Sequence, residues 1–351
     1  MINYKQRLIK RLLACICLAV LCTGYIVGVF FFDQQFQRKK QMECDKKAQS
    51  EFTQLVSQIR GELNQCKMPA VKMLIDLEYD PTFDYSNEES VYKALEELLG
   101  DNEILSGAIM GFEDWVYPQY AGHNGFGPLV RRSDSTLVRI QIGEHRDFRV
   151  QNEWYQKQLA DPKPEWSKPF LSDDSVMIAT YTIPLFDKGK YMGGFGIDID
   201  LSRLASDIEH FSPYPSSLVV VVDEELNILI HPNRSYIGTT KLSDAMLRVG
   251  IEPNNHPLYH SKDRQGGVDY DYMGSRQMAF YYAPLADTNW MVLLYVPTDE
   301  IYEPILSSHM LFVALAIAGL LLFGTAFGIS IYRYMREYKM YHTMGSGGYS
   351  D

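Results

Sequence analysis

The chain has 351 residues, of which 46% are hydrophobic and 22% charged, so it is long enough for two ordinary domains and too apolar for a disordered protein. Its formal net charge of −11 argues against nucleic acid or anionic lipid as a partner of its main body, and it is compatible with small cationic or zwitterionic ligands. The cysteines and histidines show no spacing typical of a zinc site, so we expect no metal and no cofactor.

The first long apolar run covers residues 12–32, and it is preceded by Lys5, Arg7, Lys10 and Arg11. A run of this length can cross the hydrocarbon layer of a bilayer as a helix. A cleaved signal peptide is the alternative, but its apolar region is usually about 7–15 residues long, and no small-x-small cleavage pattern follows here. We therefore expect a cytoplasmic tail at residues 1–11 and a membrane-spanning helix at residues 12–32.

Residues 33–77 have the pattern of a long stalk helix that continues out of the membrane. Apolar residues recur there at helical spacing, at Phe52, Leu55, Ile59 and Leu63. The stalk also carries Cys44 and Cys66, which would face an oxidising compartment. On one continuous helix these two cysteines would be about 33 Å apart, too far for a disulfide, so an internal bridge would require the helix to break. The sequence leaves open whether either cysteine forms a disulfide.

After a turn-rich patch, a second helix is expected at residues 88–99, with Ser86 and Asn87 as capping residues. The pattern then changes to short apolar or alternating segments that are separated by Gly, Pro, Asp and Asn. The predicted strands are residues 105–112, 137–142, 176–184, 191–199, 217–222, 228–231, 268–272, 277–284 and 290–296.

A proline-rich segment at residues 211–215 divides these strands into two groups, because no helix or strand passes readily through it. The sequence therefore predicts an α+β fold with antiparallel sheets in two lobes. The membrane-distal lobe is expected at residues 78–210 and the membrane-proximal lobe at residues 211–304.

The second long apolar run covers residues 310–332, and Arg333, Arg336 and Lys339 follow it. Basic residues flank the outer end of each run, so by the positive-inside rule both termini are cytoplasmic and residues 33–308 are extracytoplasmic. We expect a cell (inner) membrane protein with two spans. The tail at residues 333–351 is too short for an output domain, so we expect either that the chain is the sensor part of a longer protein or that it signals through a cytoplasmic partner.

Short motifs follow one another in the part between the two apolar runs. The distal lobe contains EWYQ at residues 153–156, WSKPF at 166–170, TYTIP at 180–184 and GGFGIDID at 193–200, and the proximal lobe contains VVDEELNILIHP at 221–232 and TNWMV at 288–292. In this order and at these spacings the motifs resemble those of double Cache (dCache) sensor domains of bacterial transmembrane receptors. The resemblance implies two PAS-like lobes and a receptor role, with a small ligand bound in the distal lobe.

The resemblance also implies which residues contact the ligand. Trp154 and Tyr155 would line the pocket, Phe170 would hold an aromatic position, and Asp198 would be the carboxylate on the strand. An aromatic wall and one carboxylate suit an amine-bearing ligand. Asp200, two residues on, is expected to cap the following helix instead. The remaining candidates for ligand binding are Asn152, Asp173 and Tyr181.

The sequence departs from the amino-acid-binding version of this family. That version carries an arginine two residues before the tryptophan and a tyrosine five residues before that arginine, where this chain has Asn152 and Asp147. Phe170 lacks the hydroxyl of the tyrosine found there. Without the arginine fork an α-amino acid loses its strongest anchor. Arg149 is a possible substitute from another position.

Several of these residues have simpler interpretations. Trp154, Trp166 and Tyr181 could be core aromatic residues of a sheet domain. Asp173 could be a solvated turn residue. The GxxxG pattern at Gly324 and Gly328 lets helices approach closely and, together with the stalk, predicts a homodimer, although glycine is also common in membrane helices.

The sequence thus favours a transmembrane sensor that binds a small extracytoplasmic molecule and relays a shift of its helices to an output domain or partner. The alternative is a membrane-anchored interaction protein that recognises a partner protein or an envelope polymer without a small-molecule pocket. Catalysis is not expected, because no nucleophile-elbow, HExxH or Walker-type motif occurs. An output enzyme such as a kinase, cyclase or phosphatase would belong to another part of a longer chain or to a partner.

Overall fold

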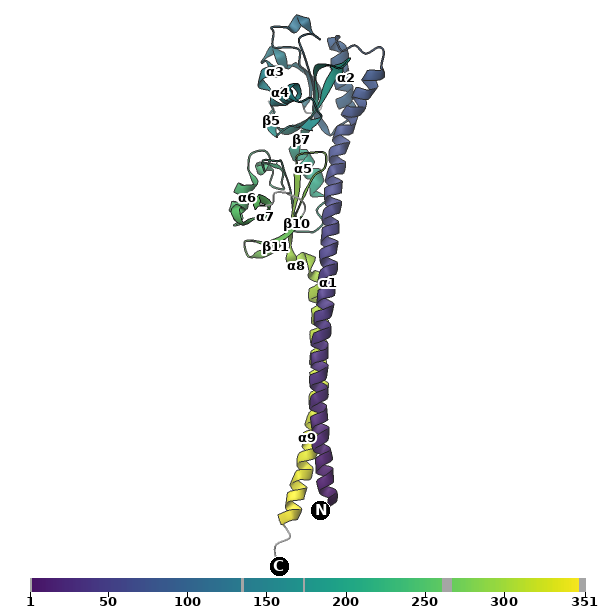
Figure 1. Ribbon diagram of the computed structural model, residues 1–351, viewed down its shortest axis with the longest axis vertical. Coiled ribbons are helices and arrows are strands. Elements are labelled where there is room, and N and C mark those ends of the chain that lie inside the picture. Colours follow the sequence, from purple (N-terminus) through teal and green to yellow (C-terminus); the bar gives the residue numbers. More distant parts are fainter. Residues whose placement is uncertain (1, 134–135, 173, 261–266, 347–351) are drawn as a thin grey trace, which may run out of the picture. The chain divides into compact units, whose positions relative to one another are not determined.

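The computed structural model describes residues 2–133, 136–172, 174–260 and 267–346. The chain forms two compact units, residues 49–298 and residues 1–48 with 299–351. The first unit is α+β with two antiparallel sheets, and the second is helical, so the predicted fold class is confirmed. Figure 1 labels the elements.

Helix α1 (Ile2–Tyr79) continues without interruption through Pro69. Its predicted apolar stripe is buried, because Phe52, Leu55, Ile59 and Leu63 are each at most 2% exposed. The ring of Phe52 packs against Tyr281, with 5.7 Å between the centroids. Cys44 and Cys66 both lie on this unbroken helix, and they form no bridge with each other.

The distal lobe is built on an antiparallel sheet with the strand order β3-β2-β1-β7-β6-β4, and β5 pairs separately with β6. Its two longest strands, β6 and β7, form a hairpin at the centre. The strands are β1 (Leu105–Phe112), β2 (Pro128–Ser133), β3 (Thr136–Gln141), β4 (Glu165–Trp166), β5 (Phe170–Leu171), β6 (Met177–Asp187) and β7 (Lys190–Asp200).

Helices α2 and α4 (Glu153–Ala160) pack against this sheet. Helix α2 (Glu88–Asp101) packs against β1 and β2, and its predicted cap is confirmed because the Asn87 side chain accepts hydrogen bonds from the backbone N–H groups of Glu89 and Ser90. Helix α4 packs against β6 and β7. The remaining short helices are η1 (Pro118–Tyr120), η2 (Ile142–Glu144) and α3 (Phe148–Gln151), and they are followed by α4 (Glu153–Ala160) and α5 (Leu201–Glu209).

The proximal lobe contains a second antiparallel sheet with the order β10-β11-β12-β8-β9. Its core includes Val220, Phe280 and Leu293, which are at most 1% exposed. The strands are β8 (Leu218–Val222), β9 (Ile228–Ile230), β10 (Gly267–Met273), β11 (Arg276–Pro284) and β12 (Met291–Pro297), and the helices are η3 (Arg234–Tyr236), α6 (Leu242–Arg248), η4 (Pro253–Asn255) and α7 (Pro257–His260).

Aromatic residues form a contact between the two lobes. The ring of Trp166, on β4, lies 5.1 Å from the ring of Trp290, just before β12, and 5.1 Å from that of Tyr181. An ion pair between Lys168 Nζ and Glu225 Oε1, 2.6 Å long, lies beside them. Exposed ion pairs of this kind stabilise a fold by about 0 to 1 kcal/mol. The buried tryptophan pair therefore provides most of the free energy that stabilises the contact between the lobes.

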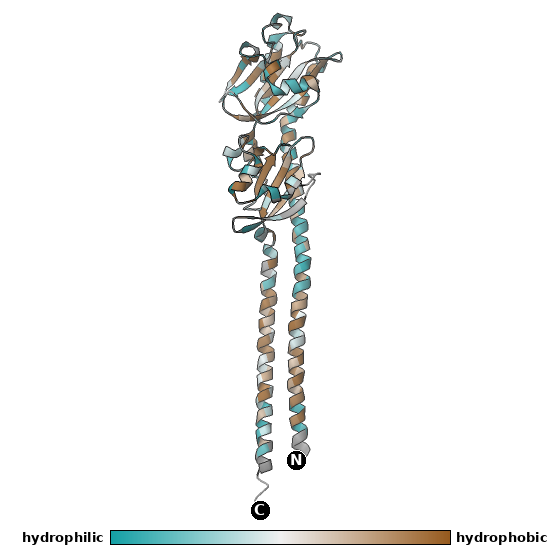
Figure 2. Cartoon of the chain, turned by 60° about the vertical axis from the view of Figure 1, so that its left-hand side comes forward, coloured by the Kyte–Doolittle hydropathy of each residue, from teal (hydrophilic) through white to brown (hydrophobic). Residues whose placement is uncertain are grey.

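The helical unit contains the first part of α1 and α9 (Glu303–Ser346), which follows α8 (Thr298–Ile301). Both long helices contain a segment that is long and apolar enough to cross a membrane, and these segments are brown in Figure 2. The Tyr25 hydroxyl donates to the carbonyl oxygen of Leu315 at 3.0 Å, and the Tyr25 ring fills the space beside Gly319. Among the described residues, no atom beyond the adjacent backbone of α9 lies within 4 Å of where a Cβ of Gly324 or Gly328 would stand, so this pair does not serve the packing of α9 on α1.

Candidate functional site

A cavity of about 500 Å³ opens in the distal lobe, between its sheet and the segments that carry the WY and WSKPF motifs. Strands β1, β2, β6 and β7 supply the floor, and residues near the start of α4 and around β5 supply the wall. The lining includes Ile109, Arg131, Trp154, Phe170, Thr180 and Asp198.

Glycine keeps the floor of this cavity open. Gly194, Gly196 and Asp198 alternate along β7 and therefore share one face of the sheet. A Cβ at Gly196 would stand 2.8 Å from a methyl group of Thr180, and one at Gly194 would stand 2.9 Å from the ring of Trp154. Any side chain at these two positions would occupy the floor or displace the wall.

Asp198 is the half-buried carboxylate on this floor. The Thr180 hydroxyl, opposite it on β6, donates a hydrogen bond of 2.5 Å to Asp198 Oδ1. Burial raises the pKa of Asp198 to about 6, although the Thr180 hydrogen bond and the positive charge of Arg131 both act to lower it. Above that pH the cavity contains a carboxylate whose Oδ2 accepts no hydrogen bond within the described part of the chain.

Asp200 has the capping role that the sequence predicted. Its side chain accepts hydrogen bonds from the backbone N–H groups of Ser202 and Arg203 at the start of α5. Both Asp198 and Asp200 line the cavity, but the carboxylate of Asp200 is engaged by the backbone of α5.

The other predicted contacts have different positions. Trp154, 7% exposed, lines the cavity, as do Asn152 and the 41% exposed Phe170. Tyr155 and Tyr181 are not among the lining residues, and Asp173 lies outside the described residues.

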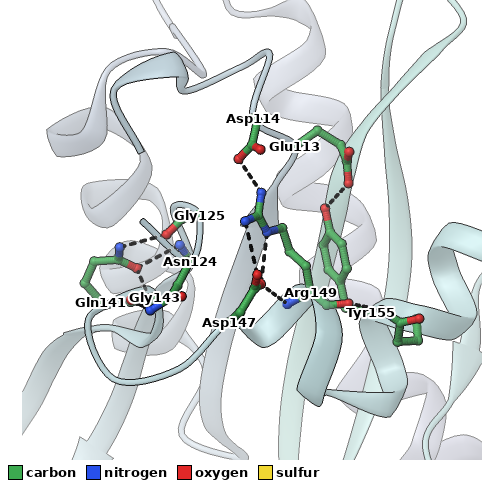
Figure 3. Close-up of polar contacts among 11 residues, drawn as sticks. Glu113, Asp114, Asn124, Gly125, Gln141, Gly143, Asp147, Arg149 and Tyr155 are labelled. Carbon is green, nitrogen blue, oxygen red and sulfur yellow. Dashed lines mark hydrogen bonds and ion pairs between the residues drawn. The ribbon is translucent and has the colours of Figure 1, made fainter. Parts of the chain in front are cut away.

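Tyr155 supports the wall from behind. Its hydroxyl donates a 2.7 Å hydrogen bond to Glu113 Oε1, which Figure 3 shows, and its ring lies 5.2 Å from that of Phe148 and 5.3 Å from that of Trp154. Burial, with the Glu113 hydrogen bond as a second cause, raises the pKa of the Tyr155 hydroxyl well above its usual range. Tyr155 therefore stays protonated and fixes the position of Trp154.

Arg149 is engaged outside the cavity, so it does not replace the missing arginine fork. Its Nε lies 3.1 Å from Asp147 Oδ1, and it forms a second ion pair with Asp114 (Figure 3). Asp147 also caps α3 through the backbone N–H of Arg149. Both residues belong to a structural cluster that holds the loop after β1 against α3.

Arg131, Thr180 and Thr182 also line the cavity and were not predicted to do so. Arg131 lies on β2, a strand that was not predicted because its second half is polar. The two threonines could have been found, since they flank Tyr181 on a predicted strand and so face the opposite side of the sheet from it. Among the described residues, no three His, Cys, Asp or Glu side chains gather where they could hold a metal ion.

Known proteins are similar to this chain in sequence over part of its length and in fold. Residues 91–206 match the family model described as the methyl-accepting chemotaxis protein-like, first PDC sensor domain. The extracellular domain assigned to a histidine kinase, mmHK1S-Z3, is similar in structure with a TM-score of 0.60 and 20% identity, over 73% of this chain and 98% of that chain.

Two chemoreceptor domains are similar at 15% identity. The ligand-binding domain of the Pseudomonas aeruginosa PAO1 amino acid chemoreceptor PctB, in complex with L-Arg, has a TM-score of 0.52 over 73% of this chain and 96% of that chain. The ligand-binding domain of the Campylobacter jejuni chemoreceptor Tlp3, in complex with L-valine, has a TM-score of 0.53 over 75% and 97%. At these identities the likeness shows the fold. Residues 91–206 are thus similar to the first PDC sensor domain of methyl-accepting chemotaxis protein-like proteins, and the region between the two long apolar segments shares the fold of these extracellular and ligand-binding domains.

Proposed function

We propose that this chain is a transmembrane receptor that binds a small amine-bearing ligand in the cavity of its distal lobe. The observation that carries the proposal is a half-buried carboxylate with a raised pKa, Asp198, on the floor of a cavity of about 500 Å³ whose wall includes Trp154 and Phe170. A cavity of this size encloses a small molecule. Aromatic faces attract a cation, and a carboxylate in such a site forms a charge-assisted hydrogen bond with an ammonium group.

The signal is proposed to leave the cavity through the WSKPF segment. Ser167, Lys168 and Phe170 line the cavity, and Trp166, directly before Ser167, packs on Trp290 of the proximal lobe. Trp290 directly precedes β12, which is followed by α8 and α9. A ligand that moves the WSKPF segment therefore changes the contact between Trp166 and Trp290. In the sequence, only β12 and α8 separate Trp290 from α9, the helix that returns to the membrane. A homodimer formed through stalk and membrane helices, and a cytoplasmic output domain or partner, complete the proposal.

The proposed topology places residues 33–308 outside the cell membrane and both termini in the cytoplasm. Single cysteines introduced at Ser133 and Asn254 in a cysteine-free chain should react with a membrane-impermeant maleimide in intact cells, whereas cysteines at Lys5 and Lys339 should react only after lysis. The expectation rests on two candidate spans with basic residues at their outer ends. Labelling of Lys339→Cys in intact cells would refute the two-span topology.

Replacing Asp198 by asparagine tests the amine site. A thermal-shift screen of the full chain in nanodiscs against amines, amino acids, organic acids and sugars first identifies a binding probe, because a ligand that binds only the folded state raises its melting temperature. For an amine probe, Asp198→Asn should weaken binding by about 2 to 4 kcal/mol, roughly 30-fold to 1,000-fold, in titration calorimetry. A screen with no hit in any class would favour the alternative of an interaction protein.

Asp200→Asn is the matched control for this experiment. Asparagine caps a helix about as well as aspartate, so this variant should keep both its stability and its affinity for the probe. A loss of affinity in Asp200→Asn with unchanged binding by Asp198→Asn would move the amine site to Asp200.

The pH dependence of unliganded melting gives a second test. Because the pKa of Asp198 is higher in the folded than in the unfolded chain, ionisation of Asp198 lowers the stability of the folded state. The stabilising contribution of its protonated form is therefore complete below about pH 4 and is lost as the pH rises toward about 6. Asp198→Asn should therefore gain stability relative to the wild type over this range, by about 1 to 3 kcal/mol. A variant that melts at a lower temperature at every pH would instead identify Asp198 as a structural residue.

A further inference from the structure

The part of α1 that directly follows its apolar segment differs in charge from the rest of the chain. The whole chain has a net charge of −11, but residues 33–47 contain five basic residues and three acidic ones. Figure 2 shows this part of α1 in teal, next to the brown apolar segment. The basic residues are Arg38, Lys39, Lys40, Lys46 and Lys47, and the acidic ones are Asp33, Glu43 and Asp45. This segment is therefore a basic region in an otherwise acidic chain.

A contact between α1 and α9 marks the level at which both apolar segments end. Asp33 is the first charged residue after residues 12–32, and His309 directly precedes residues 310–332. His309 Nδ1 lies 3.1 Å from Asp33 Oδ2, and the Gln37 side chain donates a hydrogen bond of 2.9 Å to Asp33 Oδ1. The two helices thus change from apolar to polar at the same level. In the proposed topology, on which this inference rests, that level is the outer boundary of the hydrocarbon layer.

The other two acidic side chains of this region also have partners. Glu43 Oε2 accepts a hydrogen bond of 3.0 Å from Lys40 Nζ, and Asp45 Oδ1 accepts one of 2.7 Å from the Tyr302 hydroxyl. Lys40 Nζ also lies 5.8 Å from the centroid of the Phe36 ring. The acidic residues therefore bind α9 or Lys40, and they do not neutralise the remaining basic side chains.

Arg38 and Lys39 are the unpaired basic residues nearest to the boundary. Both are exposed, and neither forms an ion pair or a side-chain hydrogen bond within the described part of the chain. At about 100° per residue, both point away from the buried face of α1 that carries Asp33 and Cys44. At 1.5 Å per residue, they lie about 7 to 9 Å beyond Asp33 along the helix.

This height corresponds to the lipid headgroups. The headgroup layer is roughly 5 to 8 Å thick on each side of the hydrocarbon. Long basic side chains bend toward the layer that solvates their charge, so both cations reach it. The surface belongs to α1 alone, because residues 298–308, which precede the apolar segment of α9, contain no lysine or arginine.

We infer that Arg38 and Lys39 form a binding surface for the headgroups of anionic phospholipids in the outer leaflet. A phosphate group accepts charge-assisted hydrogen bonds from both a guanidinium and an ammonium group. Near an anionic membrane surface, each basic side chain strengthens binding by about fivefold. Lys46 and Lys47 do not belong to this surface. They lie about 20 Å beyond Asp33, more than a Debye length of about 8 Å above the headgroup layer.

The test uses a fluorescent reporter, Phe31→Trp, in the full chain in nanodiscs. Phe31 is 58% exposed, lies in the apolar segment and precedes Arg38 by seven residues, so it shares the helix face of Arg38 two turns below it. Lipids with brominated chains quench tryptophan fluorescence only at short range. The four native tryptophans all lie in the lobes, at Trp115, Trp154, Trp166 and Trp290. Quenching therefore reports the lipids next to position 31.

Two series of nanodiscs contain phosphatidylcholine and phosphatidylglycerol in varying ratio, with the bromine on one lipid or on the other. Their quenching curves give the exchange constant between the two lipids at the reporter. We expect phosphatidylglycerol to be preferred by about tenfold to 25-fold, the range for two basic residues near the surface. The preference should fall to about one when Arg38→Gln and Lys39→Gln are combined, and high salt should weaken it in the unsubstituted stalk.

Lys46→Gln combined with Lys47→Gln is the matched control. It removes the same charge from the same helix two turns farther out, so the preference for phosphatidylglycerol should survive. Equal losses in the two double variants would show that the net charge of the stalk attracts lipid without a headgroup surface, and the inference would be overturned. Inorganic phosphate at constant ionic strength should leave the preference unchanged. If inorganic phosphate removes it, the surface binds a soluble phosphate group and the lipid assignment is wrong.

The same measurement separates this inference from the proposed topology. If neither brominated lipid quenches the reporter, position 31 does not lie in a bilayer, and the topology is overturned together with the inference. If both lipids quench it with an exchange constant of about one, the topology stands and only the lipid-binding surface is overturned. Binding of an amine probe in the distal lobe is measured independently of both outcomes.

Discussion

Replacing Gly193 by alanine is expected to lower the free energy of unfolding of the sensor domain by about 3 kcal/mol or more. Gly193 begins the part of β7 that pairs with β1, and its φ of +153° is a conformation that L-residues rarely adopt. A Cβ there would stand 2.0 Å from the carbonyl oxygen of Gly111. The obstacle is backbone of the neighbouring strand, so the sheet itself would have to move.

The loss should appear as a melting temperature lowered by roughly 6 to 12 °C for a domain of this size, measured on the full chain in nanodiscs. Gly100→Ala is the matched control, because Gly100 lies in α2 with nothing within 4 Å of its Cβ position. Alanine is the better helix former there and should raise stability by up to about 1 kcal/mol. Equal melting temperatures for the two variants would contradict the register of β1 and β7.

Removing Trp166 is the second large effect that we expect. Its ring is 8% exposed and packs on both Tyr181 and Trp290, so Trp166→Ala should cost about 3 to 5 kcal/mol, the range for truncating a buried aromatic residue. Trp290→Ala should cost a similar amount. Because each variant already breaks the contact between the two rings, the double variant should lose less than the sum, by about 0.5 to 1.5 kcal/mol.

Urea unfolding of the four chains in detergent, followed by far-ultraviolet ellipticity, gives the double-mutant cycle directly. Trp115→Ala is the control for the loss of a tryptophan as such, because Trp115 is 38% exposed and should contribute less than about 1 kcal/mol. Strict additivity of Trp166→Ala and Trp290→Ala would mean that the two rings do not interact, and it would remove the proposed path between the lobes.

Local pattern predicted most of the fold but only part of the site. The stripe from Phe52 to Leu63 has a helical period that depends only on sequence spacing, and it is buried as expected. Strand β2 was not predicted, because Arg131, Arg132 and Ser133 break the apolar pattern. Its place in the sheet is set by pairing with β1, about twenty residues away, and no local pattern contains that information.

Motif position alone also could not say which way each aromatic residue faces. Trp154 and Tyr155 are neighbours on α4, and one step along a helix turns the side chain by about 100°, so the two cannot share the cavity. Tyr181 alternates with Thr180 and Thr182 on β6 in the same way. The helices and strands themselves were predictable from the sequence. The periodicity of each helix or strand then decides which residue of a motif lines the cavity.

The contact between Trp166 and Trp290 has an optical consequence. The two indole rings are 5.1 Å apart at an angle of 43°, close enough for their electronic transitions to couple as an exciton. Coupled transitions of non-parallel chromophores produce a circular dichroism band of two opposite signs, which fades steeply as the rings separate or rotate. The chain thus carries an unlabelled spectroscopic reporter at the junction of its two lobes.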